Sequence, residues 1–190
     1  SAFERAIDLH GRSGNQLDIA QATHGLACSA MYEGRYQRAE ELDERAFEIA
    51  RAVGDRPLMA TAHELLALLM TRNGSYDAGI ARCQMALELY RADGDSLGVS
   101  HALVFLGTFA LWKGDLDQAE LWGTEVMTAA PDGWEQSAAF ANQLLGYVEL
   151  DRANYREAGT LIRKSLVHHY PNLGGMAVAE CFEGLAGVAA

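Results

Sequence analysis

Three short stretches of the sequence carry residue types that metal or nucleotide sites use. His63-Glu64-Leu65-Leu66-Ala67 begins like the helix of a zinc protease, but the second histidine, four residues after the first, is absent. His168 and His169 are adjacent, so on a helix their rings point about 100° apart and cannot chelate one metal ion well without further ligands. Gly11-Arg12-Ser13-Gly14 lacks the spacing and the lysine of a phosphate-binding loop. We therefore expect no metal, no cofactor, no catalytic residue and no enzymatic activity.

The three cysteines, Cys28, Cys83 and Cys181, are odd in number, widely spread and without a Cys-x-x-Cys pair. This pattern is typical of reduced thiols in a cytoplasmic protein. The sequence begins without a signal peptide, and no run reaches the roughly 18 apolar residues of a membrane span, so we expect a cytoplasmic location and no membrane contact. No motif points to a Cys-His or Ser-His-Asp set, although sequence alone does not decide whether distant residues form one.

Composition indicates a folded, acidic, helical protein. Of 190 residues, 49% are hydrophobic and 22% are charged, which favours folding over disorder. The formal net charge of -11 would repel nucleic acids and acidic membrane surfaces, so we expect no direct contact with either.

A six-residue stretch recurs through the chain and predicts how it is organised. Gly34–Ala39 returns 40 positions later as Gly74–Gly79 and again as Gly114–Ala119, and 39 positions further on as Ala153–Ala158. Each copy has a turn residue, an aromatic residue or Leu two positions on, and a small residue three after that. A recurrence at a fixed period of this size indicates a repeat array.

The apolar spacing predicts two helices in each repeat, with glycines between them. We expect an all-α array over 1–190 with full repeats near 16–55, 56–95, 96–133 and 134–174, flanked by half-repeats at 1–15 and 175–190. The expected helices are near 17–33, 36–53, 56–73, 76–92, 96–113, 116–130, 134–152 and 155–169, with the last half-repeat starting another first helix. Because both ends fall inside repeats, we expect a fragment of a longer array, or end helices that pair with another copy.

The repeated residues resemble the tetratricopeptide repeat (TPR) family. That family has small residues at the eighth and twentieth places, a turn glycine at the fifteenth, an aromatic residue at the seventeenth and alanine at the twenty-seventh. The eighth and twentieth places are where the two helices of a hairpin cross, so only small side chains let the backbones approach. Here the matching sets are Ala27, Ala67, Gly107 and Gly146; Ala39, Gly79, Ala119 and Ala158; Gly34, Gly74, Gly114 and Ala153; Tyr36, Tyr76, Leu116 and Tyr155; and Ala46, Ala86, Val126 and Ser165.

The resemblance implies an α-solenoid, a right-handed superhelix of antiparallel helix hairpins. The family repeat is usually 34 residues long, whereas this one is 40, with second helices that end in Gly-Asp. The longer form is similar to arrays in large bacterial transcription activators of the maltose-activator-like LuxR group, where the array is a sensor or interaction arm.

The resemblance also implies a partner-binding groove lined by the first helix of each repeat. The family's chaperone-tail clamp is not expected, because its Lys and Asn places hold His24, Cys28, Leu65, His101 and Phe105 here. Transferred to this sequence, the groove residues are Gln21, His24, Cys28, Tyr32, Thr61, Glu64, Leu68, Arg72, His101, Val104, Thr108, Trp112, Phe140, Gln143, Tyr147 and Asp151.

Three functions remain open at this level. The first is a protein- or peptide-binding scaffold within a larger bacterial transcriptional regulator. The second is a small-molecule effector-binding domain that controls attached ATPase or DNA-binding domains. The third is a self-association domain, a homo-oligomer formed through the end helices.

Overall fold

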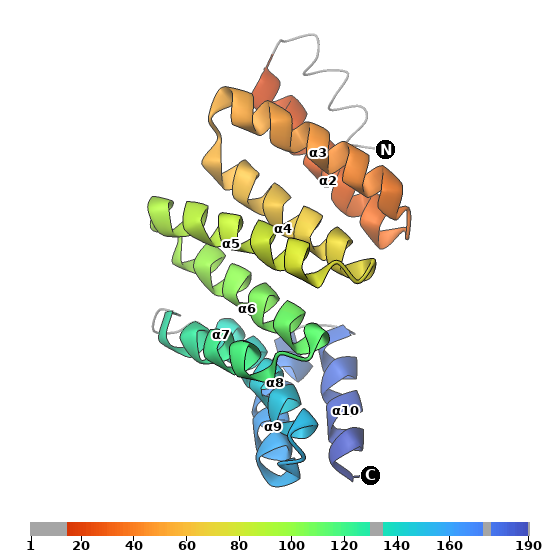
Figure 1. Cartoon of the computed structure of the whole chain (residues 1–190), viewed down its shortest axis with the longest axis vertical. Helices are drawn as coiled ribbons and strands as arrows, with labels where there is room; N and C mark the ends of the chain where they lie inside the picture. Colours follow the sequence, from red (N-terminus) through yellow and green to blue (C-terminus); the bar gives the residue numbers. More distant parts are fainter. Residues whose placement is uncertain (1–14, 130–134, 173–175, 190) are drawn as a thin grey trace. The chain divides into compact units, whose positions relative to one another are not determined.

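A computed structural model describes residues 15–129, 135–172 and 176–189, and every regular element among them is an α-helix (Figure 1). The prediction of an all-α fold of repeated helices is confirmed. The chain divides into two compact units, Ser1–Gly94 and Asp95–Ala190.

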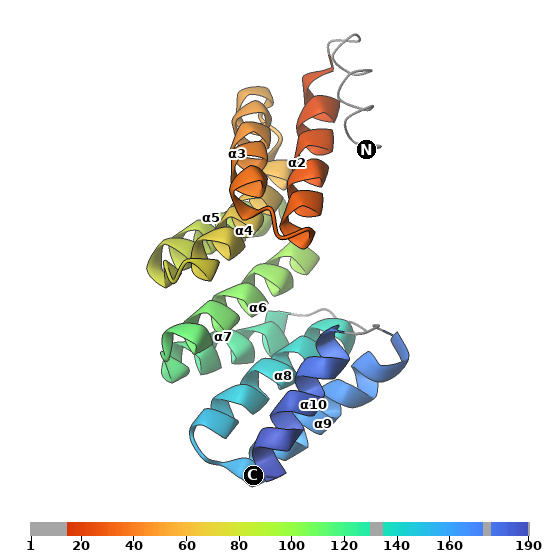
Figure 2. The same cartoon turned by 90° about the vertical axis from the view of Figure 1, so that its right-hand side faces the viewer.

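Unit 1 contains two helical hairpins. α2 (Gln16–Tyr32) packs on α3 (Tyr36–Val53), and α4 (Arg56–Arg72) packs on α5 (Tyr76–Asp93). The hairpins meet through α3 and α4, and α2 also touches α4. Figure 2 shows α2 and α3 side by side in the red and orange part of the chain.

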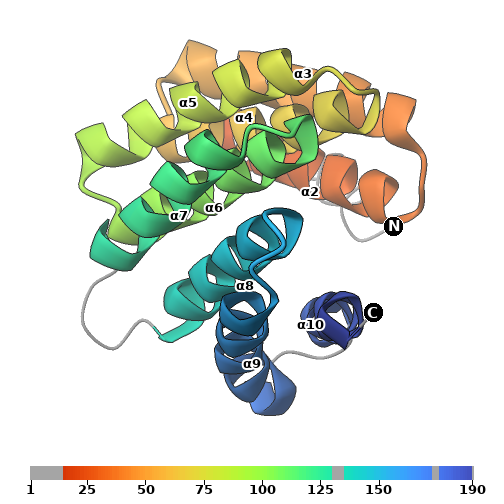
Figure 3. The ribbon, with the colours of Figure 1, turned by 60° about the horizontal axis from the view of Figure 1, so that its bottom comes forward.

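Unit 2 repeats this plan with one additional helix. α6 (Ser96–Lys113) pairs with α7 (Leu116–Ala129), and α8 (Glu135–Asp151) pairs with α9 (Tyr155–Asn172). α10 (Met176–Ala189) packs against both α8 and α9, as Figure 3 shows at the blue end of the chain. It packs on α9 and α8 as α4 packs on α3 and α2.

The observed bounds agree with the predicted helices to within two residues except at the end of α9. That helix runs through Asn172, three residues past the prediction, so Pro171 lies in its last turn. A proline there removes only one hydrogen bond close to the end of the helix, which a terminal turn tolerates better than the helix interior does. The predicted half-repeat at 1–15 lies almost wholly outside the described residues.

The turn inside each hairpin uses one left-handed residue. Gly34, Gly74 and Gly114 have φ angles of 76°, 78° and 84°, and Ala153 holds the same conformation at φ 62°. Glycine adopts this region without a Cβ penalty, whereas an alanine there is strained. The repeated glycine of the sequence pattern is thus explained by backbone geometry.

The repeated Gly-Asp pair ends one helix and begins the next. Gly54 and Gly94 are left-handed C-caps of α3 and α5. Asp55 and Asp95, directly after them, accept hydrogen bonds from the backbone N–H of Leu58 (2.9 Å) and of Gly98 (3.0 Å). The aspartates are therefore N-caps of the next helices, a role that the sequence interpretation of a helix stop did not include.

The helix crossings are filled by small residues, as predicted. Ala27, Ala39 and Ala119 are fully buried. A Cβ added at Gly79 would lie 2.6 Å from Thr71 Cγ2 and 3.0 Å from the carbonyl oxygen of Ala67. Gly79 is therefore required by close backbone approach.

Among the described residues, one helix, α6, has the length and composition of a membrane span, at a mean hydropathy of 1.2 over 18 residues. Three of its apolar side chains, those of Leu103, Leu106 and Phe109, are fully buried in unit 2, whereas Leu97 and Trp112 are exposed. The hydropathy of α6 is thus accounted for by packing within unit 2.

We predict that Ala153→Gly stabilises the protein by about 1 kcal/mol, because glycine removes the strain of a left-handed alanine. Chemical unfolding followed by circular dichroism measures this change. Ala81→Gly is the matched control, since Ala81 is exposed inside α5 and its replacement should cost about 1 kcal/mol. A loss of stability in Ala153→Gly would contradict the assignment of strain.

We predict that Gly79→Ala destabilises the protein although alanine is the better helix former. Overpacking costs about 1–3 kcal/mol and the helix gain is about 1 kcal/mol, so the net loss should reach up to about 2 kcal/mol. Thr71→Ser removes the methyl group that the new Cβ would meet. Gly79→Ala should therefore cost less in the Thr71→Ser background, as a double-mutant cycle of unfolding free energies would show, and equal costs in both backgrounds would refute the contact.

Candidate functional site

The residues predicted to line a groove lie on the first helices of the hairpins. In unit 1 they lie on α2 and α4, which touch each other. In unit 2 they lie on α6 and α8, which also touch each other. Their exposure differs widely. Gln21, Tyr32, Arg72, His101, Trp112 and Asp151 are exposed; His24, Cys28, Thr61, Leu68, Val104, Thr108, Phe140 and Tyr147 are partly buried; Glu64 and Gln143 are buried.

In unit 1 the structure joins two of these residues with a buried carboxylate that the sequence analysis did not single out. His24 Nδ1 lies 2.6 Å from Oδ1 of Asp43, and His24 Nε2 lies 3.7 Å from Sγ of Cys28. Asp43 is 0% exposed, and its Oδ2 has no hydrogen-bond partner among the described residues. Cys28, His24 and Asp43 therefore form a hydrogen-bonded triplet, with two residues from one turn of α2 and one from α3.

The protonation of His24 and Asp43 follows from their burial and from the hydrogen bond between them. Burial disfavours the charged form of His24, but its hydrogen bonds to Asp43 and Cys28 outweigh that cost and raise the pKa of His24 to about 10. Burial raises the pKa of Asp43 above its ordinary value, and the hydrogen bond with His24 opposes that rise. At neutral pH we therefore describe the pair as an imidazolium held by a carboxylate.

An imidazolium in this position has restricted chemistry. With both ring nitrogens protonated, His24 can donate to Asp43 and to the Cys28 sulfur but cannot accept a proton as a general base. The arrangement therefore resembles a hydrolytic triad in composition but not in protonation.

Asp43 left a signal in the sequence. It stands four residues after Ala39 and three before Ala46, so it occupies the apolar face of α3. An acidic residue on a buried helical face needs a partner from another element. His24 and Cys28, four residues apart on α2, could have been matched to it.

The two polar residues of the incomplete zinc-protease motif, His63 and Glu64, are both buried. The His63 ring packs against the Phe47 ring with centroids 4.7 Å apart. Glu64 accepts a hydrogen bond of 3.2 Å from the hydroxyl of Tyr90 on α5. Since the two side chains face different neighbours, they do not form one ligand set.

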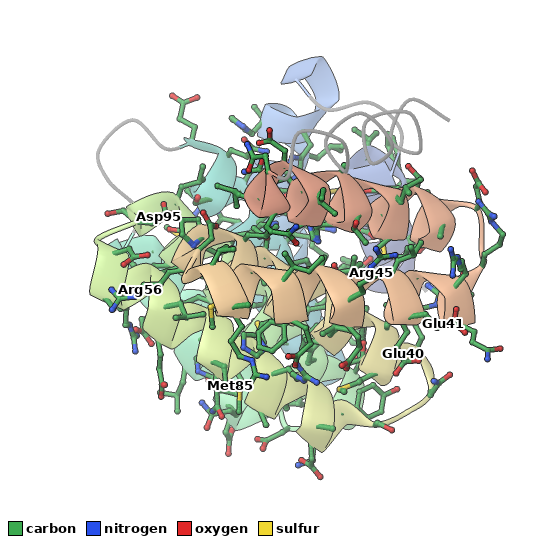
Figure 4. The ribbon with its side chains drawn as sticks, turned by 90° about the horizontal axis from the view of Figure 1, so that it is seen from above. Glu40, Glu41, Arg45, Arg56, Met85 and Asp95 are labelled. Carbon is green, nitrogen blue, oxygen red and sulfur yellow. The ribbon has the colours of Figure 1, made fainter. Side chains whose placement is uncertain are left out.

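One arginine of α5 contacts two side chains of α3. Arg82 donates to Glu44 at 3.1 Å, and its guanidinium lies over the ring of Phe47. Burial and the charge of Arg82 lower the pKa of His63 to about 4. The outer face of α3 and α5 beyond this contact carries exposed side chains such as Glu40, Glu41 and Met85 (Figure 4).

In unit 2, α6 carries a row of aromatic rings along one side. His101 meets Phe105 edge-on at 4.7 Å, and Phe105 stacks on Phe109 at 5.7 Å. Phe109 in turn contacts Trp112 at 5.9 Å. We call His101, Phe105, Phe109 and Trp112 the aromatic row. Its ring at Phe109 is fully buried, whereas its two ends, His101 and Trp112, are exposed, Trp112 by 51%.

Two predicted groove residues of α8 instead hold α10 in place. Gln143 Nε2 donates to a carboxylate oxygen of Glu180 at 2.6 Å, and the Tyr147 hydroxyl donates to the Glu180 backbone carbonyl at 2.7 Å. Burial, followed by the charges of Glu180 and Glu183, raises the pKa of Tyr147 to about 12. These two side chains therefore support the repeat stack, a use that only the position of α10 reveals.

The two adjacent histidines lie at the α8–α9 contact. Their ring centroids are 5.8 Å apart at 73°, and the buried His169 ring packs on Phe140. Burial lowers the pKa of His169, which keeps the ring neutral. Within the described residues, no three His, Cys, Asp or Glu side chains are placed to hold a metal ion.

An open hollow of about 410 Å³ lies beside these histidines on α8 and α9. Its walls include Glu135, Asn142, Lys164 and His168 as well as apolar side chains. It is not the closed apolar pocket that would favour a small-molecule effector.

Comparison of the sequence with other proteins found one curated relative. No protein-family model matches the chain. Tetratricopeptide repeat protein 29 of Trypanosoma brucei brucei is 32% identical over 119 residues, which is 63% of this chain and 25% of that protein. The chain thus spans about a quarter of the length of the curated relative.

Solved structures with similar folds are also helical-repeat proteins. The apo form of the quorum sensor NprR from B. thuringiensis matches with a TM-score of 0.78 and 15% identity, over 100% of this chain and 54% of that one. BtubC from P. vanneervenii matches with a TM-score of 0.74 and 21% identity, over 99% and 83%. At these identities the likeness shows the fold alone, and that fold is TPR-like.

We predict that the pair of His24 and Asp43 makes stability depend on pH above neutrality. The folded pKa of about 10 exceeds the unfolded value near 6.5, so the pair's contribution is complete below 6.5 and is lost as pH rises towards 10. The slope is at most about 1.4 kcal/mol per pH unit. Urea unfolding between pH 7 and 8.5 measures it.

His24→Asn should remove most of this slope, because asparagine does not titrate. His168→Asn is the matched control: His168 has the same 19% exposure, but its carboxylate partner Glu135 is 82% exposed. If His24→Asn leaves the slope between pH 7 and 8.5 unchanged, the ion pair does not form as described.

Proposed function

We propose that this chain is an interaction module that binds a protein or peptide through the first helices of its hairpins. The support is a division of labour between helix faces. The repeating small residues, such as Ala27 and Ala39, are fully buried at the crossings and can contribute only to folding. The side chains that differ from repeat to repeat lie on α2, α4, α6 and α8, and several of them are exposed.

The observation that carries the proposal is the exposure of Trp112, at the C-terminal end of the aromatic row. A tryptophan that is 51% exposed and is backed by a buried ring with its centroid 5.9 Å away is a preformed apolar anchor. Such anchors dominate the binding energy of protein interfaces, because a rigid ring buries a large area at little cost in entropy. Tyr32, 81% exposed at the end of α2, offers the corresponding ring in unit 1.

We further propose that the module is a cytoplasmic arm of a larger bacterial transcriptional regulator. The 40-residue period is similar to that of LuxR-type activators, and the fold match to a quorum sensor supports a sensing role. A small-molecule effector is the alternative ligand, and self-association through the end helices is the other candidate. A helix-turn-helix segment or a phosphate-binding loop in the parent sequence beside this chain would support the regulator.

We predict that Trp112→Ala reduces partner recovery at least tenfold, in line with the 2 kcal/mol or so of a buried aromatic anchor. The chain is immobilised and partners from a lysate of its source organism are quantified by mass spectrometry. Tyr32→Ala should weaken recovery by a smaller factor if the ligand reaches unit 1. Native mass spectrometry with a small-molecule extract tests the effector, and light scattering tests self-association.

Leu121→Ala is the matched control, because Leu121 is 64% exposed on α7, the second helix of the same hairpin. It should leave recovery unchanged. Equal recovery with wild type, Trp112→Ala and Leu121→Ala would sink the assignment of the aromatic row to a partner.

A further inference from the structure

We propose that Cys28, His24 and Asp43 form a thiol-modification site, at which Cys28 undergoes thiol–disulfide exchange with low-molecular-weight disulfides. The site does not depend on the proposed interaction function. Its basis is geometric: the sulfur lies 3.7 Å from His24 Nε2, and the opposite ring nitrogen lies 2.6 Å from a fully buried carboxylate.

The carboxylate fixes the imidazole in one orientation. Asp43 comes from α3 and His24 from α2, so the pair is held by the packing of the hairpin rather than by one flexible side chain. The hydrogen bond at Nδ1 turns Nε2–H towards the Cys28 sulfur. The raised pKa of His24, about 10, keeps that proton in place at neutral pH.

Few other groups act on this set. The remaining charges that reach Asp43 are Glu44 on α3, which raises its pKa, and Arg82 on α5, which lowers it. α4 contributes the apolar side chains of Leu65 and Leu69 to the cluster on which Cys28 packs. The thiolate is the nucleophile in thiol–disulfide exchange, and the His24 ring places a positive charge 3.7 Å from the Cys28 sulfur.

The exchange balances without any group from the protein other than Cys28. The Cys28 thiol loses its proton to water, and the thiolate attacks one sulfur of the disulfide. A new S–S bond forms as the old one breaks, so Cys28 is oxidised to a mixed disulfide and the departing half is reduced to a thiol that takes a proton from water. His24 stays protonated and stabilises the attacking thiolate.

The other two cysteines of the chain are internal controls for the reactivity of Cys28. Cys83 and Cys181 are fully buried, whereas Cys28 is partly exposed. Cys181 Sγ donates to the hydroxyl of Ser165 at 3.6 Å, and burial raises the pKa of its thiol. Neither buried thiol is therefore expected to react while the chain is folded.

The test is site-resolved alkylation of the folded 190-residue chain with iodoacetamide, followed by peptide mass spectrometry. At pH 7, Cys28 should react at least tenfold faster than Cys83 or Cys181. It should also react at least tenfold faster than the same cysteine in His24→Asn, which keeps a donor for Asp43 but removes the imidazolium. At pH 9.5, which lies above the ordinary pKa of a free thiol, wild type and His24→Asn should react within about threefold of each other.

A purely structural role for His24 would change access to Cys28 equally at both pH values, so an equal rate change at pH 7 and 9.5 overturns the proposal. Asp43→Asn, which keeps the hydrogen bond but removes the charge, should slow Cys28 at pH 7 as well. Incubation with oxidised glutathione should place the mixed disulfide on Cys28 alone. If wild-type Cys28 reacts no faster than Cys83, or if glutathione is found on no cysteine, the proposal fails whatever the variants do.

Discussion

The close crossing of two helices in each hairpin is the constraint on which the rest of the structure depends. At Gly79 the backbone of α5 comes so near to Ala67 that even one methyl group would meet its carbonyl oxygen at 3.0 Å. At Gly146 on α8 an added Cβ would lie 2.6 Å from a side-chain carbon of Ile162 on α9. Because these contacts leave no space, the sequence can vary there only among the smallest residues.

The connections follow from the same geometry. A hairpin that crosses tightly needs a sharp turn, and a left-handed residue supplies it, at Gly34 as at Ala153. The aspartate that follows Gly54 then caps α4 through the N–H of Leu58. Helix end, turn and helix start are thus encoded in two or three residues, which is why the period is visible in the sequence.

The residues outside this frame carry the chemistry. His24 and Cys28 vary freely with respect to the repeat, yet they meet a buried carboxylate of α3. The aromatic row on α6 passes through the unit 2 core at Phe109 and reaches solvent at Trp112. His24, Cys28 and the aromatic row lie on first helices, α2 and α6, where the fold fixes the backbone and leaves the side chain open. Each hairpin can therefore hold a different surface on the same frame.

The sequence by itself determined the helices and turns of this protein, because both depend on contacts between residues close in the chain. Apolar spacing predicted α3 and α6 to the residue, and repeated glycines located the turns. The tertiary structure decided which candidate site residues are available. The sequence placed Glu64 and Gln143 in the groove together with the exposed candidates. In the structure, however, Glu64 is hydrogen-bonded to Tyr90 and Gln143 to Glu180, which are 26 and 37 residues away in the chain. The position of Asp43 on the apolar face of α3 indicated a partner on another helix, but only the packing of α2 on α3 showed that this partner is His24.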